Sequence, residues 1–401
     1  MAEVGCEVFF LVDRLGARSE VESLRRLGEG LARFGHDCNV LCSSAPADHG
    51  LDDLVECPGL GRRWQIPWAI RGLELGDEPV KARIMHVRSS DLAEAALAIA
   101  ERWKIPYLFE LEEFPRRDLK LRLSRAWCRG LIVPNRELTE ALVRDFGIPG
   151  EIIHEADLGL EEPEGPPPDL DRNAGRLPVV GAAGKLVADS GFVTFLNAAR
   201  KVVDQGFDAE FLIAGHGDDE GDLRRKAERL KIAERLTFAD DLPLGLSFWP
   251  ILDVYCQTSI SPTLGRPLRT AMACGVPSIA SDVEGLRSLV RAGENGLIVP
   301  PGDSSALALA IVDLLGDRPR AAKLGQAARL AVARNNDPDR AAARLDRLYR
   351  DVVGPEPSNQ ASGLASRTLG PDDPGRREAD ADDERSFPRI SRGFGATNDR
   401  S

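Results

Sequence analysis

Residues 178–186 read PVVGAAGKL and residues 211–217 read FLIAGHG, so each carries an apolar run into a glycine-containing turn. Short apolar runs alternate in this way with longer amphipathic stretches through most of the chain. This alternation is typical of repeated βα units, in which parallel strands are covered by helices. The sequence therefore predicts an α/β fold.

The alternation is interrupted once, at residues 161–168, which read EEPEGPPP. Prolines and like charges oppose both helices and sheet ladders, so a linker is expected there. Before it, strands are expected at Val8–Val12, Cys38–Cys42, Ile84–Val87, Pro106–Phe109, Gly130–Val133 and Glu151–His154, with helices near Ser19–Phe34, Asp91–Trp103, Asp118–Cys128 and Arg136–Phe146. After it, strands are expected at Pro178–Ala182, Glu210–Ala214, Leu236–Phe238, Val254–Gln257, Ser278–Ser281 and Gly296–Val299, followed by helices at Ser304–Leu315, Pro319–Arg334 and Asp337–Val353.

The composition excludes several classes of protein. The 401 residues suffice for two to three domains, and 43% hydrophobic with 29% charged residues is ordinary globular usage. The net charge of -12 disfavours a sequence-independent nucleic-acid binder, which needs a positive field. The apolar runs are too short for a membrane span, and Glu3 and Glu7 oppose a signal peptide, so we expect a cytoplasmic protein. The seven cysteines are scattered and lack paired histidines, so no metal site is expected.

The second half of the chain resembles the C-terminal domain of family 4 retaining glycosyltransferases. The resemblance lies in segments that occur in the family's order and spacing, namely Ala182–Leu186, Phe211–Gly217, Ala271–Pro277, Ala280–Asp282 and Glu294–Asp303. The first half is similar more loosely, through Phe9–Gly16, Gly35–Asp37, Met85–Arg88 and Val133–Asn135.

The resemblance implies the GT-B fold, two Rossmann-like doubly wound domains facing across a cleft. It implies an N-terminal acceptor-side domain at residues 1–160, a linker at 161–176, a nucleotide-sugar domain at 177–336 and a helix at 337–353 that crosses back to the N-terminal domain. Residues 354–401 are poor in apolar side chains and are expected to form a disordered tail. No cofactor is implied, because the nucleotide-sugar is a substrate.

The resemblance also implies where the sugar donor binds. Lys185 matches a phosphate-binding arginine of the family, although a lysine after a strand is otherwise most often an exposed surface residue. The glycine turns allow the backbone to approach a ligand, and the start of the helix at Gly265 and Arg266 could offer N–H groups to phosphate; a turn without ligand and an exposed loop arginine are the alternatives. The expected donor-binding residues are Gly184, Lys185, Ser190, Gly215, Gly217, Gly265, Arg266 and Thr270.

On the acceptor side the resemblance implies three residues. His86 stands where the family often has a histidine at a strand end, and Arg88 takes the place of a second histidine, so both are candidate catalytic residues. Gly16, in the loop after the first strand, is the candidate acceptor-binding residue. A single histidine ending a strand is otherwise most often structural.

The sequence departs from the family at the donor site. The family has two glutamates eight positions apart that hold the donor sugar and the ribose, and Pro262 and Thr270 stand at those places. A second phosphate-binding lysine is replaced by Ser190. Of four charged donor contacts only Lys185 is retained.

Two functions follow. The first is transfer of a sugar from a nucleoside-diphosphate sugar to a hydroxyl of a glycan or lipid-linked acceptor, with retention. The alternative is a catalytically inactive GT-B descendant that serves as a binding or scaffold module, and a nucleotide-sugar epimerase is a more distant one. The basic stretch Arg116–Trp127 would allow peripheral contact with the inner face of a membrane, or would pack as an ordinary amphipathic helix. The donor sugar, the acceptor and the oligomeric state are not determined by the sequence.

Overall fold

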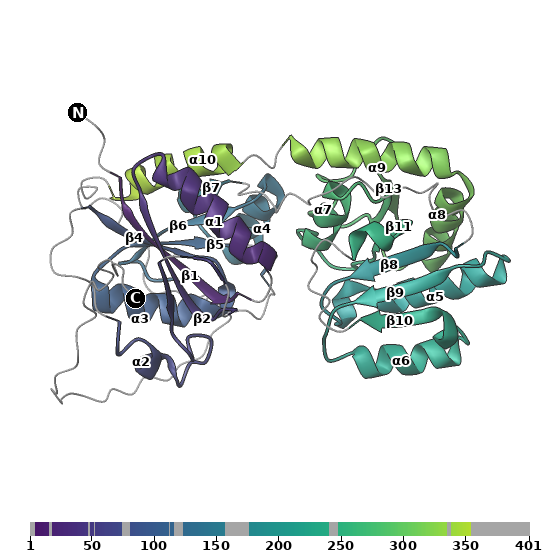
Figure 1. Cartoon of the computed structure of the whole chain (residues 1–401), viewed down its shortest axis with the longest axis horizontal. Helices are drawn as coiled ribbons and strands as arrows, with labels where there is room; N and C mark the ends of the chain where they lie inside the picture. Colours follow the sequence, from purple (N-terminus) through teal and green to yellow (C-terminus); the bar gives the residue numbers. More distant parts are fainter. Residues whose placement is uncertain are drawn as a thin grey trace, which may run out of the picture.

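The structure is a computed structural model that describes residues 5–15, 18–46, 49–51, 53–73, 81–111, 113–115, 123–156, 176–239, 248–334 and 338–353. These residues form two sheets of parallel strands, each with helices on its faces. The two sheets lie side by side along the long axis of the molecule (Figure 1). The prediction of a two-sheet α/β fold is confirmed.

The N-terminal sheet has seven strands in the order β3-β2-β1-β4-β5-β6-β7, all paired in parallel. The strands are β1 (Glu7–Arg14), β2 (Asp37–Ser44), β3 (Leu54–Glu56), β4 (Arg83–Val87), β5 (Tyr107–Glu110), β6 (Cys128–Val133) and β7 (Ile153–Glu155), and the helices are α1 (Arg18–Ala32), α2 (Ile66–Ala69), α3 (Ala93–Trp103) and α4 (Arg136–Phe146). Alternate residues of β1 face opposite cores. Phe9 and Leu11 pack with α3, whereas Val8 and Phe10 pack with α1.

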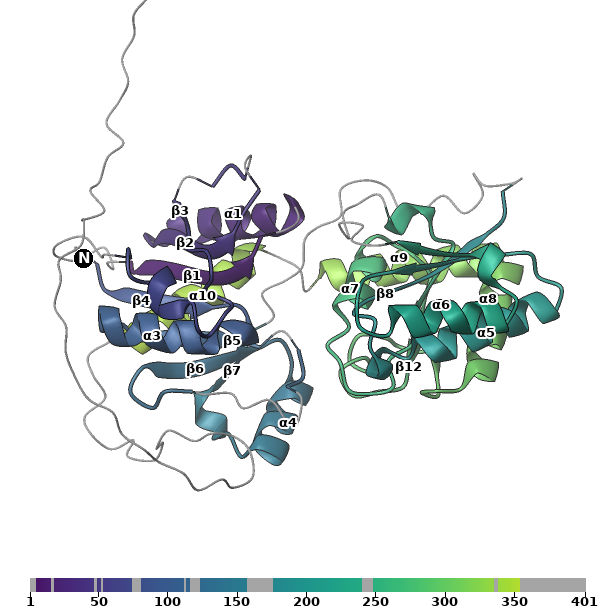
Figure 2. The same cartoon turned by 90° about the horizontal axis from the view of Figure 1, so that it is seen from below.

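The C-terminal sheet, which lies beside the N-terminal one in Figure 2 as well, has six parallel strands in the order β10-β9-β8-β11-β12-β13. Its elements are β8 (Val179–Ala183), β9 (Glu210–Ala214), β10 (Leu236–Ala239), β11 (Val254–Gln257), β12 (Ser278–Ser281), β13 (Leu297–Val299), α5 (Phe192–Asp204), α6 (Glu220–Arg229), α7 (Arg266–Ala273), α8 (Ser304–Gly316) and α9 (Arg318–Ala333). One face packs against α5, α6 and α8, and the other against α7 and α9. Burial of both faces explains why these strands read as continuous apolar runs.

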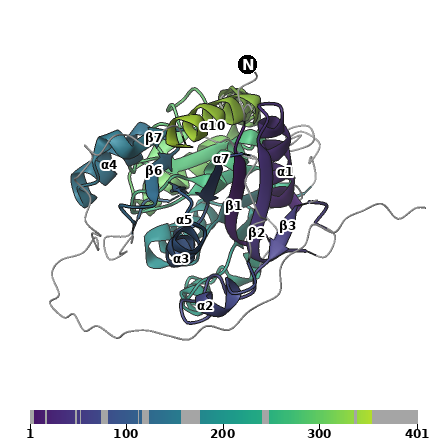
Figure 3. The same cartoon turned by 90° about the vertical axis from the view of Figure 1, so that its left-hand side faces the viewer.

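The last described helix, α10 (Pro338–Val353), follows the C-terminal domain in sequence but packs on the N-terminal sheet. Ala341, Leu345, Leu348 and Tyr349 are buried there among side chains of β1, β2 and α1. Figure 3 shows α10 and α1 above the same sheet. The chain therefore returns to the domain in which it began.

The structure corrects one expectation and adds one strand and one short helix. Asp118–Cys128 was expected to be a helix, but in its described part residues 123–127 form a loop and turn, and Cys128 begins β6 because it pairs with Tyr107. The short edge strand β3 and the single-turn helix α2 were not expected, because neither is long enough to give a periodic pattern. Gly16, residues 116–122, nearly all of the expected linker and residues 354–401 lie outside the described residues.

Candidate functional site

The carboxyl ends of β8 and β11 form the topological switch point of the C-terminal sheet, since the chain runs outward from β8 in one direction and from β11 in the other. In open α/β sheets, ligands bind where the strand order reverses, just beyond the carboxyl ends of the strands. Gly184 and Lys185 follow β8, and Thr258 and Ser259 follow β11. This edge is the candidate donor site.

The glycines at this edge are required by contacts between two loops. Gly215 has φ +135°, and a Cβ on it would lie 1.9 Å from the carbonyl oxygen of Gly184. A Cβ on Gly217 would lie 2.3 Å from the carbonyl oxygen of Leu186. The loops are joined by hydrogen bonds from the amide of Gly184 to Ala214 O (3.0 Å) and from that of Leu186 to His216 O (2.8 Å). Both glycines thus have a structural role that does not depend on a ligand.

The side chain of Lys185 is exposed, and its ammonium forms no hydrogen bond or ion pair with any other described residue. Ser190 brings no second charge to this loop. Its hydroxyl donates a hydrogen bond to the backbone carbonyl of Lys185 at 2.7 Å. The next residue, Gly191, has φ +71°, and a Cβ there would lie 1.8 Å from Thr258 O. The loop after β8 is therefore held in place while the ammonium of Lys185 stays available.

The loop between β11 and α7 carries the other predicted donor residues. Gly265 precedes α7 with φ +62°, and its amide donates to Thr263 Oγ1 at 3.3 Å. Arg266 is the first residue of the helix and its side chain is exposed. Thr270 donates its hydroxyl to the carbonyl of Arg266 at 3.1 Å, and Pro262 is exposed in the preceding loop. The structure thus brings Gly265, Arg266 and Thr270 together at the start of α7.

A buried polar chain at the same edge was missed by the sequence analysis. The Tyr255 hydroxyl lies 2.7 Å from Gln257 Oε1 and 3.3 Å from Ala183 O, and Gln257 Nε2 donates to Ser259 Oγ at 2.9 Å. Burial raises the pKa of Tyr255 well above its ordinary value, so the hydroxyl stays protonated. The chain ties the end of β11 to the end of β8. The polar run Gln257-Thr258-Ser259 directly after an apolar strand was the available signal.

The N-terminal sheet has its own switch point, between β1 and β4. Arg88 follows β4 with a side chain that is 15% exposed, and its Nε donates to Glu110 Oε2 at 2.8 Å. His86 is fully buried, with Nε2 at 3.3 Å from the same carboxylate oxygen and Nδ1 at 2.7 Å from the hydroxyl of Tyr349. The structure brings His86 and Arg88 together around Glu110, a residue that the sequence analysis did not identify.

Burial and charge set the protonation of this cluster. Burial opposes ionisation of Glu110, but the Arg88 guanidinium and the contact with His86 outweigh it and lower the pKa of Glu110 to about 2. Burial lowers the pKa of His86, against the opposing effect of Glu110. At neutral pH the cluster holds an ionised carboxylate, a cationic Arg88 and a neutral imidazole. His86 has no surface of its own to offer an acceptor.

Other features bear on cofactors and membranes. No group of three His, Cys, Asp or Glu side chains suited to a metal ion occurs in the described part of the chain. None of the described helices combines the length and apolarity that crossing a bilayer requires. A surface hollow between α5 and α8, lined by Lys201, Asp204, Ser305 and Leu309 among others, includes none of the predicted donor residues.

Comparison with known proteins finds a family that resembles the C-terminal half of the chain. Residues 177–317 match the family described as glycosyl transferases group 1. Phosphatidyl-myo-inositol mannosyltransferase of Mycobacterium leprae is 40% identical over 129 residues, which are 31% of this chain and 33% of that protein. The Mycobacterium tuberculosis enzyme of the same name is 34% identical over 211 residues, 49% of this chain and 54% of its own. The matched segments thus span a third to about half of these relatives.

The fold similarity extends further than the sequence similarity. The structure of Anabaena HepE in complex with UDP-glucose covers 86% of this chain and 99% of its own with a TM-score of 0.68, at 15% sequence identity. The glycines and the cation that the sequence singled out lie within the matched residues 177–317. The chain has the GT-B fold, and its residues 177–317 are similar to the glycosyl transferases group 1 family.

Proposed function

We propose that this chain is a glycosyltransferase that moves a sugar from a nucleoside-diphosphate sugar to a hydroxyl acceptor with retention. The observation that carries the proposal is the edge formed by the loop after β8 and the start of α7. This edge lies at a switch point and within the residues matched to the family. The ammonium of Lys185 at this edge forms no hydrogen bond or ion pair with the other described residues. An exposed cation held over a rigid backbone is suited to an anionic ligand.

Sugar transfer requires stabilisation of the charge that develops on the leaving diphosphate. Lys185 would contact the diphosphate directly, and the first amides of α7 would add the positive end of a helix dipole. Arg266, exposed at the first position of α7, would supply a second cation. Gly184, Gly215 and Gly217 let the backbone come close, and Ser190 and Thr270 remain proposed donor contacts of the same edge.

On the acceptor side, Arg88 is the proposed contact residue, because its side chain lies at the switch point and is partly exposed. His86 is fully buried, so we propose that it acts through Glu110 rather than on the substrate. Gly16 remains a proposed acceptor contact from the sequence.

The acceptor class is proposed from the relatives. The mycobacterial relatives are named as phosphatidyl-myo-inositol mannosyltransferases, and phosphatidyl-myo-inositol is a lipid. A lipid-linked acceptor would place the protein in the cytoplasm, peripherally bound to the inner face of a membrane. The basic stretch that begins at Arg116 and ends at Trp127 would contribute to that contact.

A non-catalytic scaffold is the second candidate, and a specific observation favours it. Neither Pro262 nor Thr270 offers a carboxylate to a donor sugar, and the Thr270 hydroxyl is bonded to the helix backbone. A scaffold of this kind would retain the fold without turning over a donor.

The test is calorimetric titration of UDP, GDP and ADP, followed by turnover of the corresponding glucose and mannose nucleotides. Binding with release of nucleotide diphosphate supports the transferase. Binding without turnover in the presence of phosphatidylinositol vesicles supports the scaffold. Absence of binding at millimolar ligand contradicts both the donor site and the transferase.

A further inference from the structure

A line of polar contacts connects α10 with Arg88 through the interior of the N-terminal domain. It runs from the Tyr349 hydroxyl to His86 Nδ1 (2.7 Å), from His86 Nε2 to Glu110 Oε2 (3.3 Å) and from that oxygen to Arg88 Nε (2.8 Å). Tyr349 and His86 are fully buried. We propose that Tyr349 is a positioning residue, which holds the Arg88 guanidinium at the carboxyl edge of the N-terminal sheet through His86 and Glu110. The consequence for sugar transfer rests on the proposed function.

The donors and acceptors of the line can be assigned from their chemistry. An ionised carboxylate only accepts hydrogen bonds, so the imidazole nitrogen that faces Glu110 is the one that carries a proton. Because the imidazole is neutral, Nδ1 then has a lone pair and accepts from the Tyr349 hydroxyl. Glu110 and the Tyr349 hydroxyl therefore favour the same tautomer of His86, with the proton on Nε2.

The Tyr349 hydroxyl is the hydrogen-bond donor that the structure places at Nδ1 of the imidazole. Phe10, from β1, packs its ring 5.3 Å from that of His86, and Tyr349 approaches edge-on. The 3.3 Å contact with Glu110 is not a well-aligned hydrogen bond. Without the Tyr349 hydroxyl, Nδ1 would lose the hydrogen bond that holds the ring in place. The ring would then be able to move relative to Glu110 and displace the carboxylate oxygen that orients Arg88.

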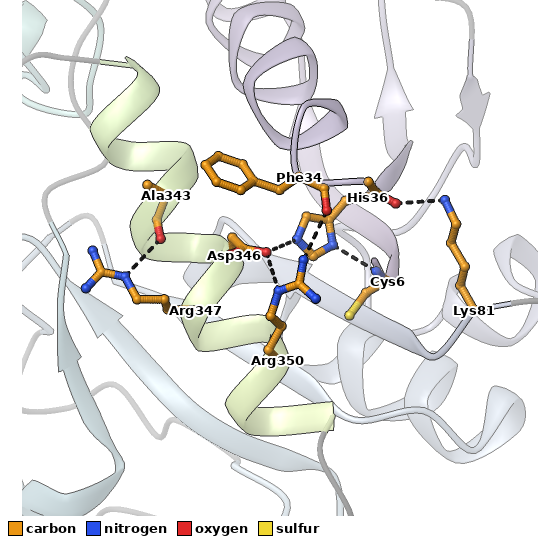
Figure 4. A network of polar contacts seen from close by, with 9 residues as sticks. Cys6, Phe34, His36, Lys81, Ala343, Asp346, Arg347 and Arg350 are labelled. Atoms are coloured by element: carbon orange, nitrogen blue, oxygen red, sulfur yellow. Dashed lines mark hydrogen bonds and ion pairs between the residues drawn. The ribbon is translucent and has the colours of Figure 1, made fainter. Parts of the chain in front are cut away.

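A second network attaches the same helix without reaching Arg88. His36 Nδ1 accepts from the amide of Cys6 (2.9 Å), and its Nε2 donates to Asp346 Oδ1 (2.9 Å), which also accepts from Arg350 Nε (2.6 Å) (Figure 4). Arg350 donates further to the carbonyl of Phe34 at 3.0 Å. Asp346 is thus a matched control, since it anchors α10 from the same helix by the same kind of contact.

The experiment compares Tyr349→Phe with Asp346→Asn in the full chain. The first readout is the nuclear magnetic resonance signal of Arg88 Nε–H, assigned by its absence in Arg88→Lys, together with the ring nitrogens of His86. We expect Tyr349→Phe to shift both signals, and Asp346→Asn to leave both in place while lowering the melting temperature. Glu110→Gln should shift the Arg88 signal as well. An unchanged Arg88 signal in Tyr349→Phe, or an equal shift in Asp346→Asn, overturns the proposal.

The second readout is turnover with a sugar-nucleotide that the wild type uses. Loss of one hydrogen bond in the line should lower kcat by about 3- to 10-fold in Tyr349→Phe with an unchanged KM for the donor, whereas Asp346→Asn keeps the wild-type kcat. If the wild type turns over no donor, the proposed function fails, but the Arg88 signal still decides whether Tyr349 positions it. If turnover is present and kcat is equal in both variants, positioning by Tyr349 is contradicted.

Discussion

The carboxyl edges of the two sheets are built by different means. In the C-terminal sheet, glycines such as Gly215 and Gly217 let loop backbones touch, and Lys185 is the exposed charge upon them. In the N-terminal sheet, a buried carboxylate, Glu110, holds Arg88 in place, and α10 closes the arrangement from the far end of the described chain. The C-terminal edge, which we call backbone-built, depends on glycines close in sequence at which a Cβ would clash. The N-terminal edge, which we call charge-built, depends on residues that only tertiary structure brings together.

Deleting residues 338–401 should have the largest effect and act on the N-terminal edge alone. The deletion removes Leu345, Leu348 and Tyr349, which are buried against the N-terminal domain, and exposes the surface that they cover. Losing the burial of three large side chains should lower the free energy of unfolding by roughly 4–9 kcal/mol. That is comparable to the whole stability of a domain. Hydrogen exchange read by mass spectrometry should show loss of protection in β1 and α1 with β8 and β9 unchanged.

The control for this deletion removes residues 354–401 only, and wild-type protection is expected for it. Equal losses of protection in β1 and α1 for both deletions would show that the contacts of α10 do not stabilise the N-terminal sheet. The distinction between the two edges would then fail.

Gly215→Ala should destabilise the C-terminal edge through a steric clash between its two loops. The new Cβ meets the carbonyl of Gly184 at φ +135°, so strain and overpacking together should cost about 2–6 kcal/mol and abolish nucleotide binding. Urea unfolding and calorimetry measure the two effects. Gly206→Ala is the matched control, because it has φ +82° with nothing within 4 Å of the added Cβ and reports backbone strain alone. If the two variants are equally stable, loop contact does not explain the glycine.

Acid should weaken the charge-built edge first. Glu110 has a pKa of about 2 in the folded chain against about 4.5 unfolded, so the unfolded state binds more protons between these values. Its contribution, up to about 3 kcal/mol, is present above pH 4.5 and is lost as the pH falls towards 2. The lowered pKa of His86 adds a loss that begins below pH 6.5. Hydrogen exchange at pH 7, 5 and 4, corrected for the intrinsic rate, should show β4 and β5 losing protection before β8 and β11. Simultaneous loss would contradict the comparison.

Lys185→Ala should have the smallest effect, confined to ligand binding. Charge-assisted hydrogen bonds contribute roughly 1.5–3 kcal/mol, so diphosphate affinity should fall by about 10- to 100-fold without a change in melting temperature. Lys185→Arg should bind at least as well, because its planar fork suits phosphate. Titration of UDP, GDP and ADP against the three proteins is the measurement. Unchanged affinity in Lys185→Ala would move the diphosphate away from this lysine.

The strands were predictable because burial on both faces turns each into an apolar run, and the observed strands overlap every expected one. The expected helix at 118–128 was wrong at its end, because cross-strand pairing of Cys128 with Tyr107 overrides a local amphipathic pattern. Glu110 was not identified for a related reason. A single glutamate that ends an apolar strand carries no sequence pattern of its own. Its partners Arg88 and His86 lie 22 and 24 residues before it, and His86 in turn contacts Tyr349 of α10.

By itself, the sequence determined the two α/β sheets and the glycine-containing turns after β8 and β9, since each depends on local periodicity or on backbone conformations that favour glycine. Tertiary structure alone decided that His86 is buried, that Glu110 joins it to Arg88, and that α10 supplies Tyr349 and Asp346 to the first domain. Those contacts join residues up to 310 positions apart. Their energies depend on burial and distance, which no sequence pattern encodes.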